Sequence, residues 1–126
     1  MADDVGALLT EVGTILAQDR AYPLDGTFLY VEAEPQSVSA SIFKDLGDHL
    51  LYQLPTQALN TVLLELWAAE PVKKRWTAMH YVIDGDRFIT SFSFDRHDPE
   101  VSMITRRQVI LDQRYGNKQV VYPPIW

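Results

Sequence analysis

Histidine and acidic residues in the second half of the chain are the first candidates for chemistry, because a histidine beside a carboxylate can move protons near neutral pH. His80 and Asp95 fall on the same predicted face of a β-hairpin, with Ser93 close by. These three residue types resemble part of a hydrolase triad. However, the chain has no Gly-x-Ser-x-Gly elbow, and Ser93 lies within a strand rather than on a strained turn. We therefore predict no catalytic residue, and a small hydrolase that uses His80 and Asp95 is the weakest alternative.

Two short acidic motifs supply oxygen ligands of the kind that hard metal ions prefer. Asp84-Gly85-Asp86 is explained by the chemistry of a hairpin turn, and Asp98-Pro99 by the start of a helix. The twelve-residue calcium loop and the His-x-x-x-His and His-Glu-x-x-His spacings are absent from the sequence. The chain also has no cysteine, which excludes thiolate ligands and disulfides. We expect no metal and no cofactor.

Nucleotide and nucleic-acid binding find little support in the sequence. None of the six glycines forms a Gly-x-Gly-x-x-Gly or Gly-x-x-x-x-Gly-Lys loop. The basic run Lys73-Lys74-Arg75 is short, as is typical of a solvated connection between a helix and a strand. Across all 126 residues, 17 acidic and 11 basic side chains give a net charge of −6. This balance argues against direct binding to nucleic acid phosphates.

The excess of acidic charge lies almost wholly in the first half of the chain. Residues 1–63 contain nine acidic and two basic residues, a net charge of −7, whereas residues 64–126 carry +1. Five residues in or beside predicted strands and turns are candidates for a partner-binding acidic surface: Asp25, Glu32, Glu34, Asp45 and Asp48. A basic protein is the expected partner, because complementary charge speeds association. The alternative is a solvated face that only aids solubility.

The elements that position these residues begin with a helix and a group of strands. Apolar residues at steps of three and four predict a helix over residues 3–20. Three strand-like runs joined by short turns predict an antiparallel meander over residues 27–54. Pro55 and Thr56 then begin a second helix, which continues to Glu70.

The strongest local pattern is a hairpin over residues 76–95, with Gly85 in its turn. One face of this hairpin is apolar and is expected to pack: Met79, Tyr81, Ile83, Phe88, Thr90, Phe92 and Phe94. The opposite face is more polar and supplies a secondary candidate surface for a partner: Trp76, His80 and Asp95. A last helix is predicted from Asp98-Pro99-Glu100 to a C-cap at Gly116, and residues 119–126 are expected to lie along the sheet or dock on the core.

Together these elements predict a single α+β domain over residues 1–126, in the order α-β-β-β-α-β-β-α, with an antiparallel sheet and helices mainly on one face. Arg106, Arg107 and Arg114 are expected in the later turns of the last helix, where cations suit the helix dipole. The sequence shows no signal peptide and no apolar run long enough to span a bilayer. We therefore expect a cytoplasmic protein with no membrane partner.

Several segments of the chain resemble the YezG-like family of bacterial immunity proteins, which neutralise polymorphic or contact-dependent toxins. The resemblance is carried by residues 28–33, 76–79, 84–88 and 92–95 and by the basic helix from Arg106 to Gly116. It implies an α+β fold and a protein that needs no catalytic group, because it blocks its toxin with a complementary surface. Several toxins of this kind are nucleases with basic active-site grooves, so that an acidic face is the expected counterpart.

A second hypothesis also describes a binding protein. Small acidic proteins with this element order are similar to secretion chaperones, which hold an effector segment and often form homodimers. The two hypotheses differ in the surface used. An immunity protein holds a folded domain on an acidic surface, whereas a chaperone holds an extended segment on an apolar one. The sequence is compatible with a homodimer in either case.

Overall fold

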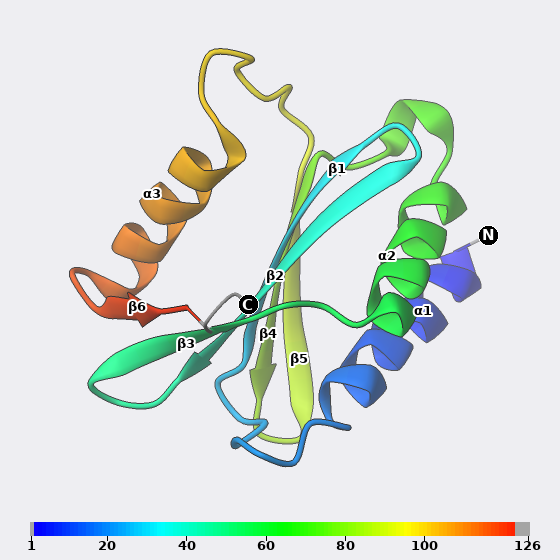
Figure 1. The fold of residues 1–126 in the computed structure, drawn as a ribbon. Coiled ribbons are helices and arrows are strands. Elements are labelled where there is room, and N and C mark those ends of the chain that lie inside the picture. Colours follow the sequence, from blue (N-terminus) through cyan, green and yellow to red (C-terminus); the bar gives the residue numbers. More distant parts are fainter. Residues whose placement is uncertain (1, 123–126) are drawn as a thin grey trace.

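The computed structural model describes residues 2–122, with side chains from Val5 onward, as one sheet with three α-helices (Figure 1). The helices are α1 (Ala2–Leu16), α2 (Gln57–Ala69) and α3 (Met103–Tyr115), with a short 3-10 helix, η1 (Val72–Lys74). The strands are β1 (Phe28–Glu34), β2 (Ser37–Asp45), β3 (His49–Gln53), β4 (Ala78–Asp84), β5 (Arg87–Ser93) and β6 (Gln119–Val121). The predicted α+β fold and element order are confirmed, and η1 and β6 are additional.

The six strands are ordered β5-β4-β1-β2-β3-β6, so that β1 lies in the middle and β5 and β6 form the edges. All neighbouring strands pair antiparallel except β3 and β6, which are parallel. The predicted meander is therefore confirmed in β1, β2 and β3. The tail lies along the sheet as far as Val121, and residues 123–126 lie outside the described residues.

β4 and β5 form the predicted hairpin around Gly85 and Asp86. Gly85 has a φ of 64°, a left-handed conformation that glycine adopts without steric cost. The register pairs Met79 with Phe92, Tyr81 with Thr90 and Ile83 with Phe88, which confirms the predicted apolar face. Two aromatic residues were predicted wrongly, because both lie beyond the paired strands. Trp76 is buried in the core instead of on the polar face, and Phe94 is 60% exposed.

α1 and α2 pack together on one face of the sheet (Figure 1). Their apolar stripes meet alternate residues of the central strand, so that Val12, Leu63 and Leu66 are buried with Leu29 and Val31. This face is an apolar core, as the spacing of the helix residues predicts.

Gly13 permits a close approach between α1 and the sheet. A Cβ atom at this position would lie 2.8 Å from the Tyr81 hydroxyl oxygen. That hydroxyl donates to the Leu9 carbonyl at 2.8 Å, and burial raises the pKa of Tyr81 to about 12. The absence of a side chain at Gly13 therefore lets a strand tyrosine satisfy its polar group on a helix backbone.

α3 covers the opposite face of the sheet (Figure 1), so that the prediction of helices mainly on one face describes α1 and α2 but not α3. The core beneath α3 is rich in aromatic rings: Phe28, Tyr30, Phe43, Tyr52 and Tyr115. Along the described part of the chain, no helix is both long and apolar enough to cross a membrane.

Two helix ends differ from their predicted positions. α1 ends at Leu16 instead of residue 20, and the Asp19 carboxylate then accepts the Ala21 N–H at 2.9 Å. α3 begins at Met103 because the Ser102 hydroxyl caps it by accepting from the Thr105 N–H. Arg106 and Arg107 consequently lie in the first two turns of α3 rather than in later turns, whereas Arg114 and the Gly116 C-cap lie where they were predicted.

Candidate functional site

The five residues predicted to form an acidic partner surface do not lie together. Asp25 and Asp48, in loops, and Asp45, the last residue of β2, are exposed at the end of the sheet where β1 begins and β2 ends. Glu34 is exposed at the opposite end of β1, beside the β1–β2 turn. Because β1 has seven residues, these two ends are roughly 20 Å apart. Glu34 therefore belongs to a different surface.

Glu32 is buried, and its prediction as a surface residue is wrong. Its side chain is 7% exposed, and Arg106 binds both of its carboxylate oxygens, at 2.7 and 2.9 Å. The Tyr30 hydroxyl donates a further hydrogen bond of 2.6 Å. Burial alone would raise the pKa of Glu32, but these hydrogen bonds and the charges of His97 and Arg106 lower it below its ordinary value. This carboxylate therefore holds α3 to the sheet instead of facing a partner.

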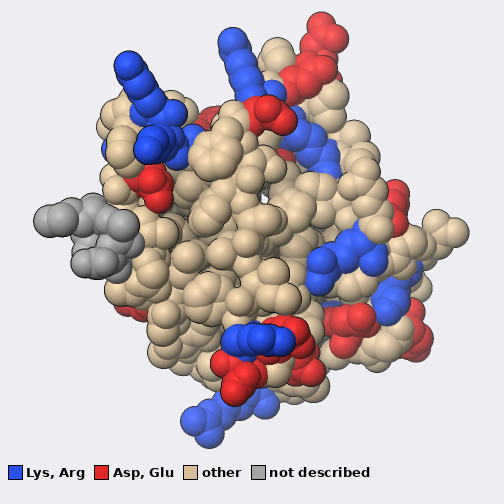
Figure 2. Space-filling view, turned by 180° about the vertical axis from the view of Figure 1, so that it is seen from behind, with Lys and Arg blue, Asp and Glu red and all other residues tan. Residues whose placement is uncertain are grey.

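Two acidic residues that sequence analysis did not assign to a surface lie beside Asp25. The exposed Asp84 and Asp86 flank Gly85 in the β4–β5 turn, and the Gly85 N–H donates to the Asp25 carboxylate at 2.8 Å. Arg87 follows directly. Figure 2 shows acidic and basic side chains gathered at the lower end of the molecule. We name the acidic end by its five residues: Asp25, Asp45, Asp48, Asp84 and Asp86.

Two members of the acidic end already have partners. Lys118 donates to the Asp45 carboxylate at 2.9 Å, and this hydrogen bond lowers the pKa of Asp45. Asp48 contacts the His49 Nδ1 atom at 2.6 Å, which lowers the pKa of Asp48. The ion pairs found among residues 5–122 do not include the other three members of the acidic end. Those three residues are therefore the better candidates for binding a basic partner.

The secondary surface predicted from the hairpin is brought together only in part. His80, Ser93 and Asp95 line one cavity of about 360 Å³ between the hairpin and α3. The backbone carbonyl of Asp95 accepts from the Thr77 hydroxyl at 2.7 Å. Trp76 lies outside this group, because its ring is buried in the core on the α1 and α2 face.

His80 is surrounded by aromatic rings in this cavity. Its ring lies edge-on to Phe28 and Tyr30, with centroid distances of 5.7 and 5.4 Å. Burial, and then the charge of Arg114, lower the pKa of His80. The side chain is therefore neutral near pH 7 and packs as an aromatic ring.

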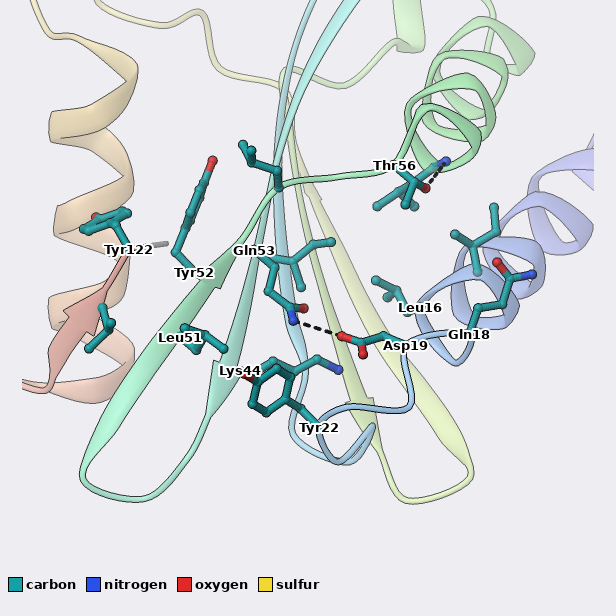
Figure 3. Close-up of a pocket in the computed structure, with 15 residues that line it drawn as sticks. Leu16, Gln18, Asp19, Tyr22, Lys44, Leu51, Tyr52, Gln53, Thr56 and Tyr122 are labelled. Carbon is teal, nitrogen blue, oxygen red and sulfur yellow. Dashed lines mark hydrogen bonds between the residues drawn. The ribbon is translucent and has the colours of Figure 1, made fainter. Parts of the chain in front are cut away.

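A further cavity of about 680 Å³ lies where β2, β3 and β6 extend beyond the cover of α1 and α2 (Figure 3). Most of its wall is apolar: Ile15, Leu16, Ile42, Leu51, Leu59 and Val121. Polar side chains gather at one end, where Gln53 donates to Asp19 at 2.9 Å and Lys44 points into the same region (Figure 3). Sequence analysis missed this cavity, because its residues come from five separate segments.

Lys44 is a buried cation in the wall of this cavity. The residue is 2% exposed, and its ammonium group donates to the Thr27 hydroxyl at 2.7 Å and to the Pro23 carbonyl at 3.3 Å. Burial lowers the pKa of Lys44, and the charge of Asp19 partly offsets this effect. One sequence feature points to it. Lys44 lies two residues after the core residue Ile42 in the same strand, so both side chains point to the same, inward face of the sheet.

Apolar walls with a few polar groups at one end are the features of a site for a mainly apolar group that also forms hydrogen bonds. The molecule thus has two surfaces of different chemistry, the acidic end and this cavity. No protein-family model matches the chain, and no curated protein is significantly similar to it. The function is therefore inferred from these two surfaces and from the motifs of the sequence.

Proposed function

We propose that this chain is a YezG-like immunity protein that binds a cognate toxin domain with its acidic end and blocks it without a chemical step. The observation that carries this proposal is the gathering of Asp25, Asp84 and Asp86 around neighbouring turns, at the end of the sheet where Asp45 and Asp48 are also exposed. The partner is a folded domain with a basic surface, such as the active-site groove of a nuclease. The proposed location is the cytoplasm, where such a toxin meets its target.

The arrangement of the acidic end suits the capture of a basic protein. Its charges act over about a Debye length, 8 to 10 Å at physiological salt, and so steer a basic domain before contact. The Asp25 side chain is tied to the β4–β5 turn by the Gly85 N–H, which limits the entropy that the turn loses on binding. Binding by this surface is expected to weaken as the salt concentration rises.

The family resemblance supports the same surface. The segment Asp84–Phe88, one of those that resemble the YezG-like family, forms the turn of the acidic end and the start of β5. The segment Phe28–Ala33 forms most of the central strand β1, which begins at the same end of the sheet. A motif of the family therefore lies within the proposed contact surface.

Charge reversal at the acidic end tests this function. The proposal predicts that a toxin domain is encoded beside the reading frame of this chain. That domain is the probe, produced as an inactive variant for calorimetry and as an active one for a growth assay. The triple variant Asp25→Lys, Asp84→Lys, Asp86→Lys is expected to weaken binding at least about tenfold, mainly through slower association, and to abolish protection. Glu32 is left out because it is buried.

A charge-matched triple variant provides the control. Glu11→Lys, Glu34→Lys and Glu100→Lys make the same change in net charge at exposed positions outside the acidic end. This control is expected to retain binding and protection. An equal loss in both triple variants, or no loss in either, would contradict the proposed contact surface.

The cavity beside β3 favours a second function, the holding of an apolar effector segment as a secretion chaperone does. Its apolar wall is open to solvent near Leu54, a lining residue that is 69% exposed. Under this hypothesis Leu54→Asp weakens binding of an effector-derived peptide at least about tenfold. The acidic-end variant would then leave binding unchanged. Under the immunity hypothesis the acidic-end variant weakens binding of the toxin domain, and Leu54→Asp leaves that binding unchanged.

A further inference from the structure

The open side of β5 lacks the features that normally protect an edge strand. β5 has seven residues, whereas the other edge strand, β6, has three. No charged residue and no proline occurs from Phe88 to Phe94, although charges and prolines are the usual protection against edge pairing. Ile89 and Phe94 are 57% and 60% exposed. β5 runs at the back of Figure 1, and Figure 2, seen from that side, shows a mainly uncharged surface in its middle.

The register with β4 determines which backbone groups of β5 face outward. Asp84 and Arg87 flank a two-residue turn and lie directly opposite each other. Such a flanking pair exchanges both of its backbone hydrogen bonds. Because the backbone groups of successive residues point to opposite sides, those of Phe88, Thr90 and Phe92 face away from β4. A strand added at this edge can therefore form a regular antiparallel ladder.

We propose that this edge pairs with the same edge of a second copy of the chain, antiparallel and centred on Ser91. Arg87 then lies opposite the partner's Asp95, and Phe88 lies opposite the partner's Phe94. Two-fold symmetry forms each of these contacts twice. One residue further out, Asp86 and Arg96 are also of opposite charge. The edge is therefore complementary in charge to itself.

Other registers lose this complementarity. A pairing centred one residue earlier, on Thr90, would set Arg87 opposite Ser93. The ion pairs found among residues 5–122 include neither Arg87 nor Asp95, so both side chains can take part in an intermolecular pair. Opposite charges at both ends thus select a single register, in which the uncharged middle of one strand faces that of the other.

The exposed Phe94 has a place in this pairing. Phe92 packs against Trp76 at a centroid distance of 5.7 Å, and Phe88 stacks on Tyr81 at 4.9 Å. Phe94 is the first residue after β5, and it remains exposed in the single chain. In the dimer the partner's Phe88 lies against it, so that the row of rings continues from one subunit to the next. Cross-strand aromatic pairs of this kind stabilise a ladder.

Sedimentation velocity over a range of protein concentrations tests the dimer with the full chain. The wild type is expected to form dimers at micromolar concentrations. Ser91→Lys places two ammonium groups opposite each other at the symmetry axis, while Ser91 is exposed in the single chain. This variant is expected to raise the dimer Kd at least about tenfold with an unchanged circular dichroism spectrum. Gln119→Lys, on the other edge strand, is expected to have no effect.

A charge swap tests the register. Arg87→Asp alone sets two carboxylates opposite each other and is expected to weaken the dimer about tenfold, whereas Arg87→Asp combined with Asp95→Arg is expected to restore it. A wild-type chain that stays monomeric at about 100 μM, well above the expected Kd, would overturn the proposal. So would a dimer that survives Ser91→Lys, or a weakened dimer that the swap does not restore.

Discussion

α2 and α3 both have 13 residues and both begin at a hydroxyl N-cap, yet they are held on opposite faces of the sheet by different interactions. The buried residues of α2 are all apolar: Leu59, Val62, Leu63, Leu66 and Trp67. α3 buries only Arg107 and Leu111. Its position depends instead on Arg106, which binds the buried Glu32 carboxylate through two hydrogen bonds.

The other arginines of α3 also contact the sheet. Arg107 donates to the Ser41 hydroxyl at 3.0 Å, and its guanidinium lies 5.0 Å from the centre of the Tyr52 ring. The Arg114 guanidinium lies 4.8 Å from the centre of the Phe28 ring. α2 is therefore attached by apolar burial, which is insensitive to pH. α3 is attached by charged groups, and the contribution of its Arg106–Glu32 pair changes with pH because Glu32 titrates.

Leu66→Ala on α2 is expected to have the largest effect on stability. Leu66 is fully buried, so that its truncation removes apolar contacts and leaves a cavity, at a cost of about 3 to 5 kcal/mol in the free energy of unfolding. Urea unfolding measures the change. Leu54→Ala is the control, because Leu54 is 69% exposed and its truncation is expected to cost below about 0.5 kcal/mol. Similar losses in the two variants would contradict an apolar attachment of α2.

Arg106→Met is expected to have the next largest effect. It leaves the Glu32 carboxylate buried without its main partner, and we expect a loss of about 2 to 3 kcal/mol at neutral pH. Hydrogen exchange should show the loss of protection mainly in α3, with α2 less affected. Arg96→Met is the control, because Arg96 is exposed. An unchanged stability of Arg106→Met would show that the ion pair does not hold α3.

The pH dependence of stability is expected to report the same pair. The folded-state pKa of Glu32 is lowered, so the stability it contributes is present above its unfolded-state pKa and is lost as the pH falls through its folded-state value. The difference in unfolding free energy between the wild type and Arg106→Met should therefore be full at about pH 7 and should shrink toward about pH 3. A difference that stays constant over this range would contradict a charged Glu32.

Removal of the two N-caps is expected to have the smallest effect. Thr56 and Ser102 each accept a backbone N–H at 3.1 Å, so Thr56→Ala and Ser102→Ala should each cost about 1 kcal/mol. In Thr56→Ala we expect the loss of protection to stay within the first turn of α2, because the apolar packing of α2 is strong. In Ser102→Ala we expect the loss of protection to extend to the Arg106 contact in α3. Hydrogen exchange compares the two helices. Equal responses along both would show that their attachments do not differ.

Local patterns predicted much of the fold because they act over a few residues. The alternation of β4 and β5 predicted that Met79 and Tyr81 share a face with Phe92, and Gly116 was predicted at the end of α3. The start of α3 was missed, because Asp98 and Ser102 are both good caps and only the folded chain selects between them. Propensity alone does not decide between two such neighbouring signals.

The candidate surfaces were predicted less well, because each is made of residues far apart in the chain. The alternation of β1 places Glu32 and Glu34 on one face, but does not reveal that α3 covers Glu32 and leaves Glu34 exposed. The same holds for the acidic end, where Asp25 meets the β4–β5 turn across 60 residues of sequence. The pairing of charges across such distances depends on how the elements are connected.

The sequence by itself determined the element order, the turns and the apolar faces, since these follow from backbone preferences and from the periodicity of apolar residues. Only the tertiary structure decided which charges are buried and which are exposed. Glu32 and Lys44 lie in strands beside residues that are buried in the core. The partner of Glu32 comes from α3 and the partner of Lys44 from the loop before β1, both far away in the sequence. Burial of a charge is costly unless a partner compensates it, and that partner is supplied by the fold rather than by the neighbouring residues.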